Sequence, residues 1–216
     1  EEFRCWAEDY CNKAGKEYCN KFCDGYILLK ALYSRSNIPK KYQFDNILKK
    51  PDDEDTLKNY VMLKKWKEDI ISHVKNGDGL YIWGRNTGTG KTSWGCKMLS
   101  YYFRKVVFES SLEFEGVFIG VSRFLEQIRD SFDNPTDEFE KLKEQVLKSK
   151  VAVFDDIGAE KPSRWVRERL YTIINERVVN DYSTIYTSNI SLNELEERYN
   201  KRIVSRIKGS CKVVRL

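Results

Sequence analysis

Residues 79–93 read Gly-Leu-Tyr-Ile-Trp-Gly-Arg-Asn-Thr-Gly-Thr-Gly-Lys-Thr-Ser, and this stretch decides the expected fold. A short apolar run leads into a glycine-rich turn, and a helical pattern begins near Lys91. Gly88 and Gly90 allow successive backbone N–H groups to point inward. Together with the positive end of the following helix, these groups form a nest that suits the β-phosphate of a nucleotide. The stretch therefore predicts a strand, a phosphate-binding loop and a helix, in that order.

The residues of this loop have separate expected roles. Lys91 supplies a cation for the β- and γ-phosphates of ATP, and the Thr92 hydroxyl is the expected Mg²⁺ ligand. The nearest upstream glycine is Gly84, so the loop is one residue longer than the pattern G-x-x-x-x-G-K-[ST]. The alternative is a glycine-rich turn that happens to precede Lys-Thr, but the flanking strand and helix favour a nucleotide site. The predicted nucleotide-binding residues are Gly88, Thr89, Gly90, Lys91, Thr92 and Ser93.

The composition fits a soluble globular protein. The chain has 216 residues, of which 33% are charged and 41% hydrophobic, enough for one α/β domain and a small appendage. Its longest apolar runs have the length of strands, so we expect no membrane contact and a cytoplasmic location. The formal net charge of +5 permits contact with nucleic acid without requiring it.

Strand-like and helix-like segments alternate along the chain. After the strand before the phosphate loop, strands are expected at 116–120, 150–157 and 184–187 and just before the C-terminus, with helices at 91–105, 122–131, 136–149 and 163–180. Before the loop, apolar residues from Leu57 to Val74 recur at helical spacing and predict one continuous helix. The only histidine, His73, is expected at the polar, exposed end of that helix. This order predicts a parallel sheet with helices on both faces.

Two neighbouring carboxylates, Asp155 and Asp156, stand where the buried strand 150–157 ends. Ligands of open α/β sheets bind at that edge. We expect Asp155 to hold Mg²⁺, directly or through water, and Asp156 to orient or deprotonate the attacking water. The alternative is an aspartate that caps a helix.

Four cysteines cluster at the N-terminus, namely Cys5, Cys11, Cys19 and Cys23. Four thiolates can close a tetrahedral Zn²⁺ site and hold a segment that is too small for a core of its own. Reduced thiols or a disulfide are the alternatives, because the spacing lacks a C-x₂-C pair. We expect residues 1–45 to form a cysteine-rich, zinc-binding segment that contacts a partner, and residues 46–216 to form the ATPase domain.

Four motifs together resemble the AAA+ ATPases of the DnaC/DnaI type, which are bacterial and phage replicative helicase loaders. They are Gly-Thr-Gly-Lys-Thr at 88–92, Val-Phe-Asp-Asp-Ile-Gly-Ala-Glu at 153–160, Tyr-Thr-Ser-Asn at 186–189 and Arg-Ile-Val-Ser-Arg at 202–206. The resemblance implies an AAA+ phosphate-loop domain of the α/β class, with a parallel sheet flanked by helices and no clear C-terminal lid.

The resemblance also assigns roles. Asn189 becomes the sensor that positions water against the γ-phosphate, although Asn189 could instead form an ordinary turn before a helix capped by Ser191 with Glu194. Arg206 becomes an arginine finger, an arginine that reaches the ATP of a neighbouring subunit, and Arg202 competes for that role. The alternative is that both arginines only form a solvated basic face of the helix. The implied catalytic residues are Lys91, Asp155, Asp156, Asn189 and Arg206.

The function implied by the resemblance is that of an ATP-hydrolysing loader that places a replicative helicase on single-stranded DNA. It implies ATP and Mg²⁺ as cofactors, with Zn²⁺ expected from the cysteines, and self-association through the ATP site. Asp156 stands where many relatives in the wider class have Glu, which predicts slow hydrolysis. Two rivals share these motifs: an IstB-like ATPase that partners a transposase, and an adaptor in which the nucleotide only switches assembly.

Overall fold

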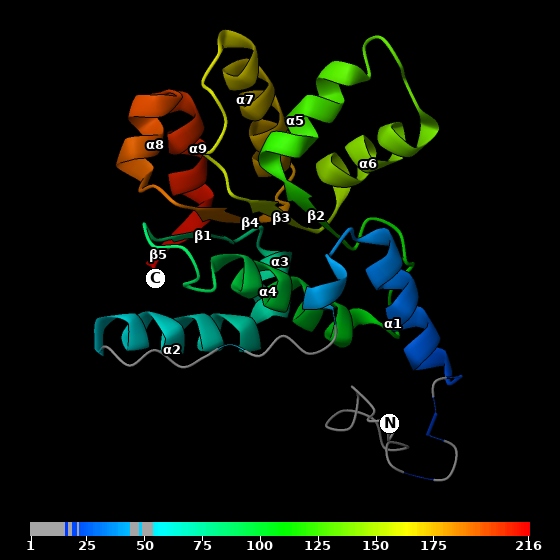
Figure 1. Cartoon of the computed structure of the whole chain (residues 1–216). Helices are drawn as coiled ribbons and strands as arrows, with labels where there is room; N and C mark the ends of the chain where they lie inside the picture. Colours follow the sequence, from blue (N-terminus) through cyan, green and yellow to red (C-terminus); the bar gives the residue numbers. More distant parts are fainter. Residues whose placement is uncertain (1–15, 17–18, 21, 44–47, 49–53) are drawn as a thin grey trace.

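A parallel sheet separates two layers of helices in the computed structural model, which describes residues 16, 19–20, 22–43, 48 and 54–216 (Figure 1). Within these ranges its strands follow the order β2-β3-β4-β1-β5, and every neighbouring pair is parallel. The strands are β1 (Gly79–Trp83), β2 (Gly116–Gly120), β3 (Val151–Asp155), β4 (Ser183–Ser188) and β5 (Cys211–Arg215). The parallel sheet between two layers of helices confirms the predicted α/β class.

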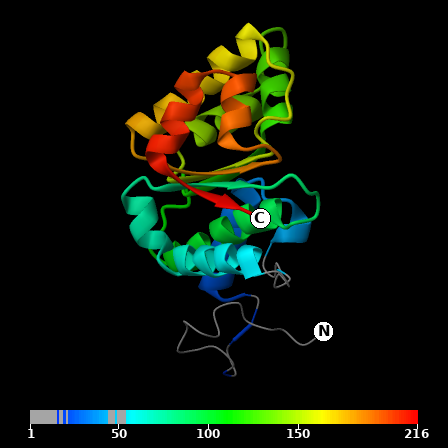
Figure 2. The same ribbon diagram turned by 90° about the vertical axis from the view of Figure 1, so that its left-hand side faces the viewer.

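The helices cover both faces of the sheet, as Figure 1 and the perpendicular view of Figure 2 show. One face carries α1 (Asp24–Arg35), α2 (Glu54–Glu68), α3 (Ile70–Lys75) and α4 (Lys91–Val106), with a 3₁₀ turn at Lys40–Tyr42. The other face carries α5 (Val121–Asp130), α6 (Asp137–Lys148), α7 (Arg164–Val179), α8 (Leu192–Arg198) and α9 (Lys201–Ser210). Each layer buries its own apolar cluster against the sheet.

Local sequence explains where these elements begin. The run Val-Ala-Val-Phe of β3 is buried on both faces, as expected for a central parallel strand. The side chains of Thr136 and Ser163 accept hydrogen bonds from the first turns of α6 and α7. Ser191 and Glu194 form a capping box at α8, as the sequence predicts.

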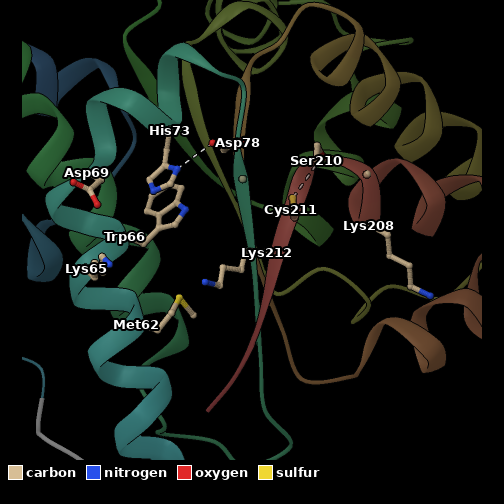
Figure 3. A pocket seen from close by; sticks show the side chains of 12 residues that line it. Met62, Lys65, Trp66, Asp69, His73, Asp78, Lys208, Ser210, Cys211 and Lys212 are labelled. Atoms are coloured by element: carbon tan, nitrogen blue, oxygen red, sulfur yellow. Dashed lines mark hydrogen bonds and ion pairs between the residues drawn. The ribbon is translucent and has the colours of Figure 1, made fainter.

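The predicted helix from Leu57 to Val74 is wrong in one respect, because the chain leaves helical geometry at Asp69 and forms two helices. Asp69 has φ −91° and ψ 15°, and α3 then turns Ile70 and Val74 into the core. The same break turns His73 back onto Trp66, with parallel rings whose centroids lie 4.5 Å apart (Figure 3). His73 also hydrogen-bonds Asp78 and is half-buried, which corrects the expected exposed position.

Helix α1 packs into the same apolar cluster as α4. Leu29 and Leu32 are buried there, the rings of Tyr33 and Phe103 meet edge to face, and the Phe118 N–H donates to the Ser36 carbonyl at 2.7 Å. The predicted domain boundary at residue 45 lies outside the described residues and stays a prediction. No helix in the described ranges is long and apolar enough to cross a membrane.

The tight contact between α4 and β3 at Gly95 generates a stability prediction. A Cβ atom at residue 95 would lie 2.8 Å from Cγ1 of Val153, whereas a Cβ at Gly209 in α9 would meet open space. We expect Gly95→Ala to lower the free energy of unfolding by about 1–3 kcal/mol through overpacking. The control Gly209→Ala should raise it by about 0.4–1 kcal/mol, because alanine restricts the unfolded chain. Urea denaturation measures both, and a Gly95→Ala protein as stable as the parent would contradict the close packing.

Candidate active site

The phosphate loop connects the carboxyl end of β1 to the first turn of α4. Gly88 and Gly90 adopt φ values of 77° and 88°, which side-chain-bearing residues rarely reach. Gly90 is the N-cap of α4, and its carbonyl accepts a hydrogen bond from Trp94 N–H at 2.8 Å. The structure thus places Thr92 and Ser93 in the first helical turn, where backbone N–H groups and the helix dipole favour an anion.

Lys91 folds over this loop. Its Nζ donates to the carbonyls of Gly84 and Asn86, both at 2.8 Å, and to the Thr89 hydroxyl at 3.3 Å. Burial lowers the pKa of Lys91, and the negative charges of Asp156 and Asp155 oppose that effect. The ammonium group therefore lies in the loop that would hold the phosphates and within the field of both aspartates.

Arg85, in the stretch that makes the loop one residue longer than the usual pattern, reaches a neighbouring helix. Its Nη2 forms an ion pair with Oε1 of Glu194 at 3.0 Å, and Glu194 is also the residue that completes the capping box of α8. The Arg85 side chain is 73% exposed, so the pair contributes little to stability. Its effect is to connect the phosphate loop to the helix that follows β4.

Asp155 ends β3 within reach of two hydroxyl groups. Thr187 Oγ1 donates to Asp155 Oδ1 at 2.6 Å, and the Thr92 side chain also hydrogen-bonds this carboxylate. Burial raises the pKa of Asp155, whereas the two hydroxyl bonds lower it. Mg²⁺ prefers oxygen ligands, so the contact between Thr92 and Asp155 fits the predicted magnesium site.

Asp156 and Asn189 also meet at this edge. Asn189 Nδ2 donates to Asp156 Oδ1 at 2.7 Å, and the Asp156 N–H donates to Thr187 Oγ1 at 3.0 Å. Asp156 has φ 58°, an uncommon conformation for a non-glycine residue that often marks a functional position. The structure therefore brings Lys91, Asp155, Asp156 and Asn189 together at the carboxyl edge of the sheet.

Sequence reasoning did not single out Thr187 as a site residue, although its hydroxyl touches both aspartates. Thr187 is buried, and its β-branched side chain lies inside a strand where such residues are ordinary. The signal that could have found it is positional, because residues near the ends of neighbouring parallel strands share one sheet edge.

The two arginines of α9 lie apart from these residues, against α7. The Arg202 guanidinium lies 4.1 Å from the centre of the Tyr171 ring, and both Arg202 and Arg206 hydrogen-bond the Tyr171 hydroxyl. Those hydrogen bonds lower the pKa of Tyr171. Both arginines are exposed, so another molecule can reach them.

The predicted zinc site is only partly within the described residues. Cys5 and Cys11 lie outside them, while Cys19 and Cys23 are half-buried free thiols just before and at the N-cap of α1. In the part of the chain that the structure describes, no group of three or more His, Cys, Asp or Glu residues could hold a metal ion. The zinc site therefore stays a prediction.

A cavity of about 550 Å³ lies at the opposite edge of the sheet (Figure 3). Trp66 and His73 line it from α2 and α3, and Gly79 and Lys212 line it from β1 and β5. Gly79 begins β1, whereas the phosphate loop follows the end of β1. This cavity is consequently separate from the phosphate loop and the two aspartates.

Comparisons with known proteins agree with this fold. The chain is 32% identical over 124 residues to the replicative helicase loader DnaI of Bacillus subtilis (strain 168), a match that covers 57% of this chain and 37% of that relative. The crystal structure of the DnaC helicase loader matches with a TM-score of 0.65 and 26% identity, over 82% of this chain and 99% of that one. A crystal structure of DnaI matches with a TM-score of 0.64 and 20% identity, over 83% and 95%. No family model matches the chain.

The position of Thr187 generates a prediction about Mg²⁺-dependent binding. Thr187→Val keeps the shape of the side chain but leaves the Asp155 carboxylate and the Asp156 N–H without this partner. We expect Mg²⁺-dependent ATP affinity to fall by about tenfold or more, the equivalent of one hydrogen bond to a charged group. Thr187→Ser is the matched control, because it retains the hydroxyl and loses only a methyl group. Titration with a fluorescent ATP analogue measures both, and equal affinities for the two variants would exclude the hydroxyl's role.

Proposed function

We propose, starting from the confirmed resemblance to the DnaC/DnaI-type AAA+ loaders, that this chain binds and hydrolyses ATP to help place a replicative helicase on single-stranded DNA. The observation that carries the ATPase part is the meeting of Lys91, Asp155 and Asp156 at one sheet edge beside the phosphate loop. The helicase part rests on the DnaI relative, a replicative helicase loader. This chain spans 37% of that relative, so the helicase and the DNA are proposed partners.

The geometry suggests how ATP would be handled. Lys91 would exchange its loop carbonyls for the β- and γ-phosphates, while the N–H groups from Gly88 to Thr92 surround the β-phosphate. Thr92 and Asp155 would hold Mg²⁺, which supplies positive charge to the phosphate oxygens. Asp156 would orient the attacking water, and Asn189 would keep the Asp156 carboxylate in place through its 2.7 Å hydrogen bond.

Self-association is part of the proposal because of Arg206. An exposed arginine on α9 can enter the ATP site of a neighbouring copy, where it would stabilise charge on the transferred phosphoryl group. Arg202 lies beside Arg206 against Tyr171 and remains the competing candidate. On this proposal each complete site contains residues from two copies of the chain.

The N-terminal segment is proposed to bind the helicase, and its zinc ligands are proposed to be Cys5, Cys11, Cys19 and Cys23. Metal analysis of the purified protein under reducing conditions tests the site. About one zinc per chain, lost in the double variant Cys19→Ser with Cys23→Ser, is the expected result. Substoichiometric zinc would contradict the zinc site and would mean that the four cysteines are ordinary thiols.

The first functional prediction concerns Lys91. We expect Lys91→Ala to weaken ATP binding or abolish turnover without unfolding the protein, because the hydrogen bonds of its amino group to other described residues all go to loop oxygens. Lys212→Ala, at an exposed lysine on β5, is the control and should leave both unchanged. Calorimetry measures affinity, and phosphate release measures turnover with and without DNA.

Two results would redirect the proposal. Unchanged ATP affinity and turnover in Lys91→Ala would remove the nucleotide site. Tight ATP binding by the parent without turnover, even with helicase and DNA present, would favour the nucleotide-switched adaptor over the ATPase.

The second functional prediction combines Asp156 and Arg206. Asp156→Asn should bind ATP without hydrolysing it, and Arg206→Ala should do the same with a rate loss of about 10³-fold or more. Mixing the two inactive proteins should restore some activity, because one interface then pairs an intact Asp156 with an intact Arg206. If mixed assemblies form and stay inactive, or if Arg206→Ala hydrolyses normally, Arg202 becomes the next candidate.

A further inference from the structure

A buried glutamate joins the loop after Asp156 to the helix pair α8–α9. Glu160 is 8% exposed, and its Oε2 accepts hydrogen bonds from the Gly158 N–H at 3.2 Å and from the Tyr199 hydroxyl. Arg198, the last residue of α8, donates to the carbonyls of Ala159 and Glu160 at 3.4 and 2.9 Å. Side chain and backbone of this turn are thus both attached to the end of α8.

Burying the Glu160 carboxyl in this attachment is energetically unfavourable. The other carboxylate oxygen of Glu160, Oε1, is buried and has no hydrogen-bond partner among the described residues. Burial raises the pKa of Glu160, the charge of Asp156 acts in the same direction, and the bonds from Tyr199 and Gly158 oppose both. A buried carboxyl with one unsatisfied oxygen destabilises the folded chain, which calls for a reason beyond stability.

The bond between Glu160 and Tyr199 is not needed to hold α8 against the sheet, because other contacts already hold this helix. Leu192 and Leu195 are buried in the core, and the Tyr81 hydroxyl donates to the Ile190 carbonyl at 2.9 Å. The capping box fixes the start of the helix as well. The bond from Tyr199 to Glu160 is therefore available for a different task.

The contacts of Glu160's turn and of Tyr199 indicate what the bond between them connects. At one end, the turn that follows Asp156 packs against the residue after Asn189, since a Cβ at Gly158 would lie 2.8 Å from Cδ1 of Ile190. At the other end, Asn200 directly follows Tyr199 and caps α9, its Oδ1 accepting from the Ile203 N–H at 3.0 Å. Helix α9 carries Arg202 and Arg206.

We propose that the hydrogen bond between Glu160 and Tyr199 is a positioning link that holds Asp156 of a chain's own site and the arginines of α9 in one fixed relation. The proposal deepens the proposed function and rests on it. Asp156 serves the chain's own ATP, whereas Arg206 serves the ATP of the neighbour. Movement at one site would consequently reach the next site through Glu160 and Tyr199.

The mixing experiment becomes the test when Tyr199→Phe is added to one partner at a time. Added to Arg206→Ala, it tests the chain that supplies Asp156. Added to Asp156→Asn, it tests the chain that supplies Arg206. We expect both additions to reduce the restored activity by about tenfold to a hundredfold, the range for a misplaced catalytic group, with ATP affinity unchanged. Glu160→Gln, which keeps an oxygen acceptor for Tyr199 and Gly158, should lose far less activity than Glu160→Ala.

Tyr102→Phe is the matched control. It removes another hydroxyl that donates to a buried glutamate, Glu115, at 2.8 Å, before the amino end of β2 and away from the phosphate loop. Tyr102→Phe should lower the free energy of unfolding by an amount comparable to Tyr199→Phe. It should not reduce the activity that mixing restores. Loss in only one mixing arm, loss in neither, or an equal loss with Tyr102→Phe would overturn the link.

A second readout separates this inference from the ATPase proposal. Hydrogen–deuterium exchange of the nucleotide-free parent and variants needs no turnover. We expect Tyr199→Phe to speed exchange in 156–160 and in 201–210 together, and Tyr102→Phe to change neither segment. Faster exchange in only one of the two segments would overturn the link. Faster exchange in both segments would support it. Either result can be read even if the protein has no ATPase activity.

Discussion

The Thr187 hydroxyl is the contact on which the geometry of the site depends. Parallel pairing of β3 with β4, with Phe154 opposite Tyr186, brings the ends of the two strands side by side. A hydroxyl can donate and accept at once, and Thr187 does both, toward the Asp155 carboxylate and from the Asp156 N–H. One buried side chain therefore fixes the backbone turn that separates two neighbouring carboxylates.

Charge balance at this edge follows from that arrangement. Burial and the charge of Asp156 favour the neutral form of Asp155, while Thr187, Thr92 and Lys91 favour the ionised form. Lys91 experiences the reverse, because its desolvation is opposed by both aspartates. A cation bound between Thr92 and Asp155 would add to the effect of Lys91 and lower the electrostatic cost of two adjacent negative charges.

The sequence predicted the parts of this fold that have a local signal. The apolar run of β3, the glycines of the phosphate loop and the capping box of α8 each follow from neighbouring residues, and all are present. The break at Asp69 has no local signal, because helical periodicity continues through it and tertiary packing of α3 decides the outcome. Thr187 and the pair of Glu160 with Tyr199 were missed for a related reason. Their partners lie 31 to 39 residues away in the chain and meet only after the strands and helices have packed.

The folded position of Lys91 has a consequence for the meaning of a measured affinity. Its ammonium group is bound by two backbone carbonyls and a hydroxyl, so the phosphate loop is internally hydrogen-bonded. If the chain binds ATP as proposed, the triphosphate would exchange these partners of Lys91 for its own oxygens, and the free energy observed would be the difference between two sets of contacts. Enthalpies of binding should accordingly be small relative to the number of new bonds, since the bonds to Gly84, Asn86 and Thr89 are surrendered in the same step.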